Sequence, residues 1–333
     1  MENTMRNKPD RLKNPILIAM LAALACLLWG SAAPFIKRGY SLLAIAGDDL
    51  PSMTLFAGLR FTIGGILVLL FAGARGRCLP VPATRTGWKR AAVIALIQTF
   101  LQYLFNFIGV GHTSGVNASI LNGTGSLFGI ILACTLYRQE RFTPRKVLGC
   151  VFGFAGVLAM NLGGQAGRIT FLGEGLMLIA SFCGAIGNCQ AKRYTQEEDP
   201  VLLTGWQTLL GGLGLTAVSL ILGGRIARFN TEGLLCLLWL GFVSAAAYSV
   251  WTVLIKHNSV SAVMVYGFLI PLFGVLISAV LLREWAQALR PGTLIALLLV
   301  CAGIMTVNLT GGRKTCQASA AERAESGTDS RPE

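Results

Sequence analysis

The fold is decided by a stretch of sequence that occurs twice. Residues 127–162 read LFGIILACTLYRQERFTPRKVLGCVFGFAGVLAMNL, and residues 272–309 read LFGVLISAVLLREWAQALRPGTLIALLLVCAGIMTVNL. The second Leu-Phe-Gly starts 145 residues after the first, at 272 against 127. Each copy contains two long apolar segments joined by a charged turn, Arg138-Gln139-Glu140 in one and Arg283-Glu284 in the other. We interpret each copy as a membrane hairpin, and the pair as a duplication.

The composition agrees with a membrane protein. Hydrophobic residues make up 54% of the 333 residues, charged residues only 13%, and the mean hydropathy is +0.64. A soluble domain carries about 25% charge. The net charge of +13 would suit a nucleic-acid partner. The basic residues, however, stand singly or in small groups between apolar runs and form no basic face, so we predict no nucleic-acid partner.

Ten nearly uncharged runs predict ten transmembrane helices, since about 20 apolar residues cross roughly 30 Å of hydrocarbon. The first run could be misread as a cleaved signal peptide, but its uncharged length favours a retained span. Residues 1–14 and 313–333 are predicted to be polar tails. The ten runs are 15–36, 50–74, 91–111, 113–137, 147–167, 175–191, 200–224, 233–255, 258–282 and 291–312.

Lysine and arginine set the expected orientation, because cytoplasmic loops are enriched in them. With the N-terminus inside, the cytoplasmic segments hold 20 of these residues and the opposite face holds 7. The remaining one is Arg60, which lies within the second run. We therefore expect both termini to face the cytoplasm, with the chain in the cytoplasmic (inner) membrane. Five spans per half then require two inverted repeats, residues 15–167 and 168–312.

These residues place the chain beside a known family. It resembles the drug/metabolite transporter superfamily, in the ten-helix branch with two EamA-type domains. The resemblance covers about residues 17–310 and implies two inverted five-helix repeats around a central cavity for a small solute. Where the family's fourth span usually carries a proline, this chain has Ser126. The motifs that carry the resemblance are Leu28-Trp29-Gly30-Ser31, Arg60-Phe61, Arg138-Gln139-Glu140, Arg283-Glu284 and Pro271-Leu272-Phe273-Gly274.

The predicted function is secondary transport of a small polar metabolite, such as an amino acid or organic anion, by alternating access across the membrane. The alternative is a non-transporting membrane protein, such as an assembly partner or a sensor. An enzyme is disfavoured because no acidic residue lies in a membrane core. No phosphate-binding loop is present, so we expect no direct use of ATP. We expect no cofactor or metal, a small-molecule substrate and the bilayer as partners, and leave homo-oligomerisation open.

The nine cysteines and the acidic turn residues are given structural roles. Seven cysteines lie within predicted spans, where we expect inert packing and no disulfide. Glu140 and Glu284 are interpreted as residues that close the two hairpin turns beside arginine partners.

Three candidate substrate-binding residues share one predicted depth. Trp29, Arg60 and Asn122 each lie eight or nine residues from the outer end of a span, or about 12 Å below the surface. Arginine is expensive in a bilayer core and usually faces a bundle interior or a watery cavity. The alternatives are a packed aromatic at Trp29 and an arginine that ties the second span to backbone carbonyls.

Further candidates lie on the third and ninth spans. Gln98 and Gln102 share one side of the third span, with Tyr103 next to them. They either contact solute or hold helices together, as amides in membranes do. Tyr266 is expected in an inner aromatic layer with Tyr248, or in a packed interface.

A hinge is predicted where the fourth and ninth spans are interrupted at matching positions, the arrangement that points to a transport site. The alternative is a close helix crossing, which is compatible with such a site. The expected hinge residues are Gly123, Gly125, Gly267 and Pro271.

Overall fold

The computed structural model describes residues 12, 14–76, 81–113, 115–161, 170–281 and 291–308. Within these ranges the protein is all-helical and contains no strand. The prediction for the C-terminal tail, most of that for the N-terminal tail and that for Glu284 fall on residues outside the described ranges.

The helices begin and end where caps and prolines favour it. Asn14 caps α1 by accepting a hydrogen bond from the Ile16 N–H, and prolines stand at the first positions of α1 and α6. The elements of the first half are α1 (Pro15–Leu42), α2 (Leu50–Gly76), α3 (Arg85–Ile94), the π-helix η2 (Ala95–Leu101), α4 (Gln102–Gly111), α5 (Gly115–Cys134) and α6 (Pro144–Met160).

The second half repeats this order. Asp199 caps α8 by accepting hydrogen bonds from the Val201 and Leu202 N–H groups. The elements are the π-helix η3 (Phe171–Gly175), α7 (Leu176–Tyr194), α8 (Pro200–Ile221), α9 (Thr231–His257), α10 (Val260–Met264), the 3₁₀-helix η4 (Val265–Phe268), α11 (Leu269–Leu281) and α13 (Pro291–Asn308).

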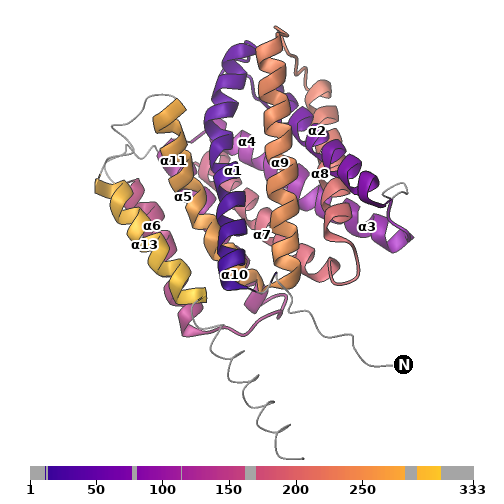
Figure 1. Cartoon of the computed structure of the whole chain (residues 1–333). Helices are drawn as coiled ribbons and strands as arrows, with labels where there is room; N and C mark the ends of the chain where they lie inside the picture. Colours follow the sequence, from indigo (N-terminus) through magenta and orange to yellow (C-terminus); the bar gives the residue numbers. More distant parts are fainter. Residues whose placement is uncertain are drawn as a thin grey trace, which may run out of the picture.

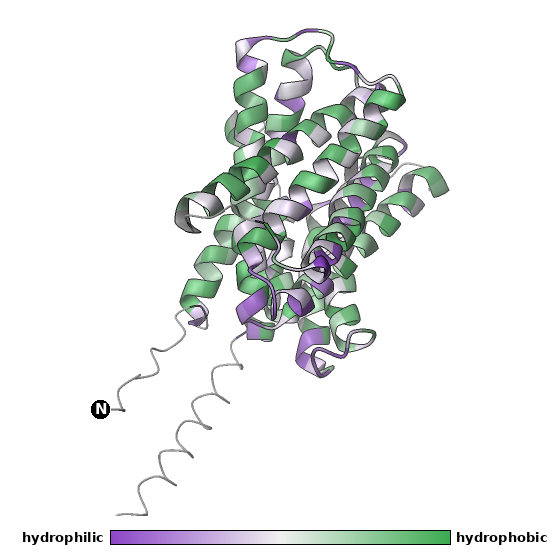
Figure 2. Ribbon diagram, turned by 90° about the vertical axis from the view of Figure 1, so that its right-hand side faces the viewer, coloured by the Kyte–Doolittle hydropathy of each residue, from purple (hydrophilic) through white to green (hydrophobic). Residues whose placement is uncertain are grey.

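The helices are those of a multi-pass membrane protein. Among the described residues, eight helical segments are long and apolar enough to cross a membrane, and Leu121–Cys134 is a shorter apolar helix. Hydrophobic residues cover these helices, and hydrophilic ones gather toward the end of the bundle near the N-terminus (Figure 2). The total of ten spans and their inversion remain predictions.

Two continuous helical segments change type along their length. The segment from α3 to α4 passes through the π-helix Ala95–Leu101, which the sequence did not predict. The segment from α10 to α11 tightens to a 3₁₀-helix at Val265–Phe268, around the predicted break at Gly267. Such changes in the hydrogen-bond ladder frequently mark hinges and functional sites.

The helices pack in related pairs. The pair α6–α13 forms one edge of the bundle, α2 and α8 lie toward the other, and α1 and α9 lie between them (Figure 1). Counted from the start of each half, α1 corresponds to α7, α9 to the α3–α4 segment, and α11 to α5. α1 packs against α9 and α11, and α7 packs against the α3–α4 segment and α5. Each of these contacts therefore has a counterpart in the other half.

The ends of the described chain lie at the same end of the bundle. The Asn258 side-chain amide donates to the Leu12 carbonyl at 3.1 Å, and the Asn308 amide donates to the Ala262 carbonyl at 3.3 Å. The first contact involves the short link between α9 and α10, and the second falls on α10 itself.

Glycines allow the helices of the two halves to approach at backbone distance. A Cβ added at Gly212 on α8 would lie 2.5 Å from the Thr62 nitrogen and 2.8 Å from the Phe61 carbonyl carbon of α2. A Cβ at Gly149 on α6 would lie 3.0 Å from the Gly303 carbonyl oxygen of α13. Small residues at such crossings are the usual way for membrane helices to associate closely.

The α2–α8 crossing gives the first prediction. Gly212→Val should lower stability by about 1–3 kcal/mol, because the added atoms meet backbone that cannot rotate away. The measurement is the thermal unfolding midpoint of the purified protein in a mild detergent. Gly47→Ala is the control, since nothing lies within 4 Å of a Cβ at that position. Equal midpoints for Gly212→Val and the wild type would contradict the close crossing.

Candidate functional site

Two tyrosines from equivalent positions of the two repeats touch each other. Tyr103 on α4 and Tyr248 on α9 are separated by 145 residues, the same offset as the repeated Leu-Phe-Gly, and their hydroxyls lie 2.8 Å apart. The contact therefore joins one residue from each half of the chain, on α4 and on α9.

Aromatic rings surround this pair, and we call Trp29, Phe61, Tyr103 and Tyr248 the aromatic cluster. The ring of Trp29 meets that of Tyr248 edge-on, with centroids 5.1 Å apart. Phe61 lies 4.4 Å from Tyr103 and 6.3 Å from Tyr248 between ring centroids. Leu215 is fully buried against these residues. Helices α1, α2, α4 and α9 thus meet at one apolar centre.

Arg60 stands beside the aromatic cluster. The residue is 6% exposed, and its Cζ lies 4.4 Å from the Phe61 ring centroid and 5.8 Å from that of Tyr103. Its Nε is enclosed without a hydrogen-bond partner. Within the described part of the chain, no carboxylate pairs with it. Asn122, predicted at the same depth, bonds to Asn106 instead.

The setting of Arg60 is energetically unfavourable for a structural residue. An arginine at mid-membrane costs about 2.5–3.5 kcal/mol on insertion scales, and usually pairs with another group or with backbone carbonyls. The face of an aromatic ring offsets part of that cost, by about 2 kcal/mol when the pair is desolvated. The guanidinium nevertheless keeps unused hydrogen-bond donors.

The two glutamines of the third span face α7 rather than the aromatic cluster. Gln98 is 5% exposed and accepts a hydrogen bond from the Gln207 amide of α8 at 3.0 Å. It packs on Gly187, where an added Cβ would lie 2.4 Å from the Gln98 Cβ, and Gln102 packs in the same way on Gly184. Gln98 thus holds helices together in this state. The Oε1 of Gln102 is buried without a partner.

Asn122 lies one helix away from the aromatic cluster. Its Oδ1 accepts from the Asn106 amide at 3.1 Å, and its side chain is exposed. Gly123 packs on Val157, and α5 is helical throughout Gly115–Cys134. The predicted weakness of this helix around Gly123 and Gly125 is therefore not visible as a break, and the hinge role of both glycines stays a prediction.

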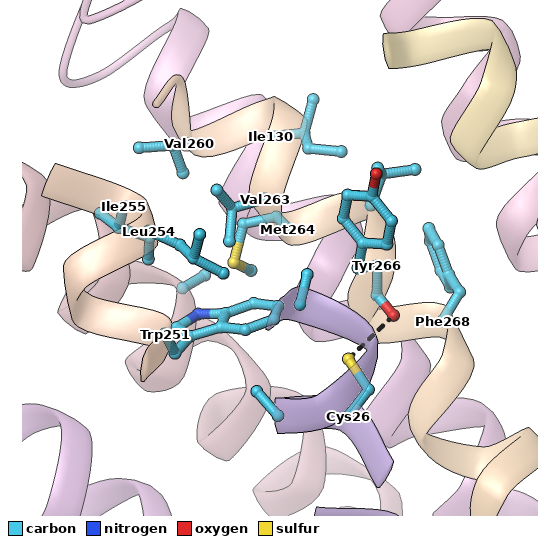
Figure 3. Packing of buried hydrophobic residues seen from close by; sticks show 14 of the residues in the cluster. Cys26, Ile130, Trp251, Leu254, Ile255, Val260, Val263, Met264, Tyr266 and Phe268 are labelled. Carbon is cyan, nitrogen blue, oxygen red and sulfur yellow. Dashed lines mark hydrogen bonds between the residues drawn. The ribbon is translucent and has the colours of Figure 1, made fainter. Parts of the chain in front are cut away.

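Tyr266 lies within the 3₁₀-helix and packs in a different hydrophobic cluster. Its backbone carbonyl accepts a hydrogen bond from the Cys26 thiol of α1 at 3.2 Å (Figure 3). Trp251 packs in the same core and meets Trp29 at 5.1 Å between centroids. Cys26 is thus a weak donor as well as a packing residue, and Tyr248 packs in the aromatic cluster while Tyr266 packs here.

The predicted hinge on the ninth span contacts the fourth span. A Cβ at Gly267 would lie 2.5 Å from the Ser126 Oγ of α5. Ser126 occupies the position that corresponds to Pro271, 145 residues later. The serine that departs from the family pattern therefore packs directly against the interrupted helix, and the two predicted hinge regions lie side by side.

The Glu140 side chain links the turn between α5 and α6 to the start of α10 by a hydrogen bond. Its carboxylate accepts from the Lys146 Nζ at 2.6 Å and from the Ser261 N–H at 3.0 Å. Burial disfavours its charge, but these hydrogen bonds hold the pKa of the carboxyl below its usual range. The expected arginine partner was wrong, because the ammonium of Lys146 is the group within reach.

The contacts of Glu140 predict a pH dependence. A carboxyl with a lowered folded-state pKa stabilises the protein above its unfolded pKa of about 4.3, and this contribution is lost as the pH falls further. Glu140→Gln should cost about 1.5–3 kcal/mol at pH 7. At pH 4 the gap in thermal midpoint between variant and wild type should narrow.

The matched control for this comparison is Glu197→Gln, whose carboxylate pairs with Arg90 while its side chain stays 68% exposed. An exposed pair contributes little, so this variant should resemble the wild type at both pH values. An unchanged gap for Glu140→Gln between pH 7 and pH 4 would contradict the role of the Glu140 carboxylate.

The tyrosine pair can be tested by a double-mutant cycle. Tyr103→Phe and Tyr248→Phe should each lower stability by about 0.5–1.5 kcal/mol, because each leaves a buried hydroxyl without its partner. The double variant should cost less than the two single losses together. The readout is the thermal midpoint of all four proteins. Additive losses would show that the hydroxyls do not interact.

Sequence reasoning missed three parts of this site. Tyr248 was placed in another layer by counting depth, whereas the repeat offset applied to Tyr103 would have found it. The contact between the Arg60 guanidinium and the Phe61 ring was only weakly indicated in the sequence, by the fact that the two residues are neighbours. The bond from Glu140 to the N–H of Ser261 joins residues 121 positions apart and left no signal.

Comparison with known proteins defines the class. Residues 16–162 and 171–309 each match the EamA-like transporter family. The chain therefore belongs to this family, within the drug/metabolite transporter superfamily. The family and its relatives indicate a membrane transporter rather than an enzyme.

Individual relatives agree along most of the chain. "Uncharacterized transporter YvbV" of Bacillus subtilis (strain 168) is 29% identical over 302 residues, 87% of this chain and 91% of the relative. A Salmonella typhimurium (strain LT2) protein named "Probable amino-acid metabolite efflux pump" is 28% identical, over 88% of this chain and 95% of its own. A solved crystal structure shares the fold, with a TM-score of 0.72, 21% identity, and coverage of 90% of this chain and 98% of its own.

Proposed function

We propose that this protein is a secondary transporter that moves a small polar metabolite, an amino acid or an organic anion, across the cytoplasmic membrane by alternating access. In this proposal ten spans form two inverted five-helix repeats, residues 15–167 and 168–312, with both termini in the cytoplasm. The observation that carries the proposal is the contact between Tyr103 and Tyr248, equivalent residues of the two repeats that meet beside a buried arginine.

The two-repeat arrangement finds support in the helix packing. The helix pairs of one half have counterparts in the other. Leu12 bonds to Asn258, between α9 and α10, and Asn308 bonds to Ala262 of α10, so both ends of the described chain lie close together, which suits an even number of spans. Two halves that each contain five spans must point in opposite directions, as inverted repeats do. Rocking one repeat against the other around a shared centre is then the expected motion.

The contacts at the end near the N-terminus support a state closed on that side. Glu140 bonds to the start of α10. The Lys192 Nζ donates to the carbonyls of Lys256 and Asn258 at 2.9 and 2.8 Å. The Gln139 amide donates to the Cys189 carbonyl at 2.8 Å. By the positive-inside argument this end faces the cytoplasm, and opening it toward that side requires these bonds to break.

The choice of a small polar metabolite draws on the relatives and on the side chains at the centre. The Salmonella relative is named for amino-acid metabolites. In this chain the arginine and the tyrosine hydroxyls supply polar groups in an otherwise apolar centre. Few polar groups in an apolar setting are typical of small-molecule sites.

The proposal is tested by thiol accessibility and solute exchange. In a background without the nine native cysteines, Ser261→Cys should react slowly with an impermeant maleimide from the cytoplasmic side, since Ser261 is fully buried. Adding Glu140→Gln should raise the rate several-fold. Gln196→Cys, at an exposed position, should react at one rate in both backgrounds.

Solute exchange provides the functional readout. Proteoliposomes loaded with a mixture of amino acids and organic acids should take up labelled members of the mixture in exchange. If no labelled solute exchanges and the Ser261→Cys rate does not respond to Glu140→Gln, alternating access is wrong. A non-transporting membrane protein would then be the better description.

A further inference from the structure

We infer that Arg60 binds a single carboxylate group of the transported metabolite, so that the substrate is a carboxylic acid in its ionised form or an amino acid. This inference rests on the proposed function and assigns its substrate class. The observation beneath it is a buried guanidinium with no counter-charge, beside four aromatic rings at the centre of the duplication.

The charges inside the described part of the protein leave Arg60 unbalanced. Arg60 and Glu174 are the two charged residues that are buried there. Glu174 accepts from the Thr113 hydroxyl and from the Thr170 N–H. It forms no ion pair with Arg60. A negative group that reaches Arg60 therefore has to come from outside these helices.

The number of positive charges favours a carboxylate over a phosphate. A guanidinium fork forms two parallel hydrogen bonds with one carboxylate. A phosphate monoester carries up to two negative charges near pH 7, and no second cation accompanies Arg60 among the described buried residues. The basic residues of α1, Lys37 and Arg38, are exposed. One cation matches one carboxylate.

The aromatic cluster makes this single pair strong and selective. Phe61 and Tyr103 cover the guanidinium at 4.4 and 5.8 Å. Rings exclude water and lower the local dielectric, which strengthens the attraction between opposite charges. The same rings offer an apolar surface to the rest of the solute. A neutral amide of equal shape gains no ionic attraction at Arg60, so the site should reject it.

A stability measurement separates this role from a structural one. If Arg60 has no partner in the protein, Arg60→Gln should fold in normal yield and unfold at or above the wild-type midpoint. Functional residues that strain a structure commonly behave in this way. If both Arg60→Gln and Arg60→Lys fail to fold, Arg60 holds the structure together and the inference is wrong.

Ligand binding is measured by the same thermal shift, because a ligand that binds the folded state raises its midpoint. The probes are acetate, benzoate, phenylacetate, glutamate and leucine, compared with benzamide, phenylacetamide, phenyl phosphate and inorganic phosphate. At least one carboxylate should raise the wild-type midpoint in a saturable way, whereas its amide should not. Arg60→Gln should abolish the shift, and Arg60→Lys should weaken apparent affinity at least tenfold, because lysine lacks the planar fork.

The control is Arg90→Gln, which removes an arginine already paired with Glu197 and Glu198 and should leave the carboxylate shift intact. Four results overturn the inference: no shift with any carboxylate, an equal shift with the amide, a shift with the phosphates alone, or a wild-type shift in Arg60→Gln. If solute exchange continues unchanged in Arg60→Gln, the proposed transport function stands and carboxylate binding at Arg60 is wrong. If the wild type binds a carboxylate but exchanges no solute, the binding site at Arg60 stands and the proposed transport function is wrong.

Discussion

Backbone-to-backbone contact between helices of the two halves is the constraint on which the site depends. In a bilayer, helices gain little from burying apolar side chains against each other, so van der Waals contact at small residues holds them together. Glycines stand around Arg60 on both of its neighbouring interfaces. Added Cβ atoms at Gly58 and Gly65 would meet the α8 backbone at 2.6 and 2.5 Å, and one at Gly64 would meet the Gly241 carbonyl of α9 at 3.0 Å.

The position of the aromatic cluster follows from these crossings. Gly30 lets α1 approach α11, where an added Cβ would lie 2.9 Å from the Gly274 nitrogen. Trp29, the residue before Gly30, is then held against Tyr248. On the other side, α2 is fixed between α8 and α9, which sets Phe61 beside Tyr103. The backbone of α2 at Arg60 is therefore held by close contact on two sides.

The sequence predicted the helices well because hydrophobic length is a local property. Depth can be counted along a single helix, and this count grouped Trp29, Arg60 and Asn122; the first two lie at the aromatic cluster, whereas Asn122 bonds to Asn106. The sequence placed Tyr248 with Tyr266, in an inner layer or a packed interface. Counting depth assumes straight spans of equal length and cannot show which helices lie side by side. The π-helix Ala95–Leu101 was also beyond reach, since residues that fit an α-helix equally well occupy it. Tertiary bonds such as that from Glu140 to Ser261 have no local signal.

The two halves are related in sequence, yet their interrupted helices are not equal. At the matching positions, α10–η4–α11 carries Gly267 and Pro271, while α5 carries Asn122 and Ser126. Proline removes a backbone donor and favours the tightened 3₁₀ turn at Val265–Phe268. Serine keeps its donor, and α5 continues as a regular helix. Because the Ser126 hydroxyl packs on Gly267, the regular helix serves as a fixed surface for the interrupted one.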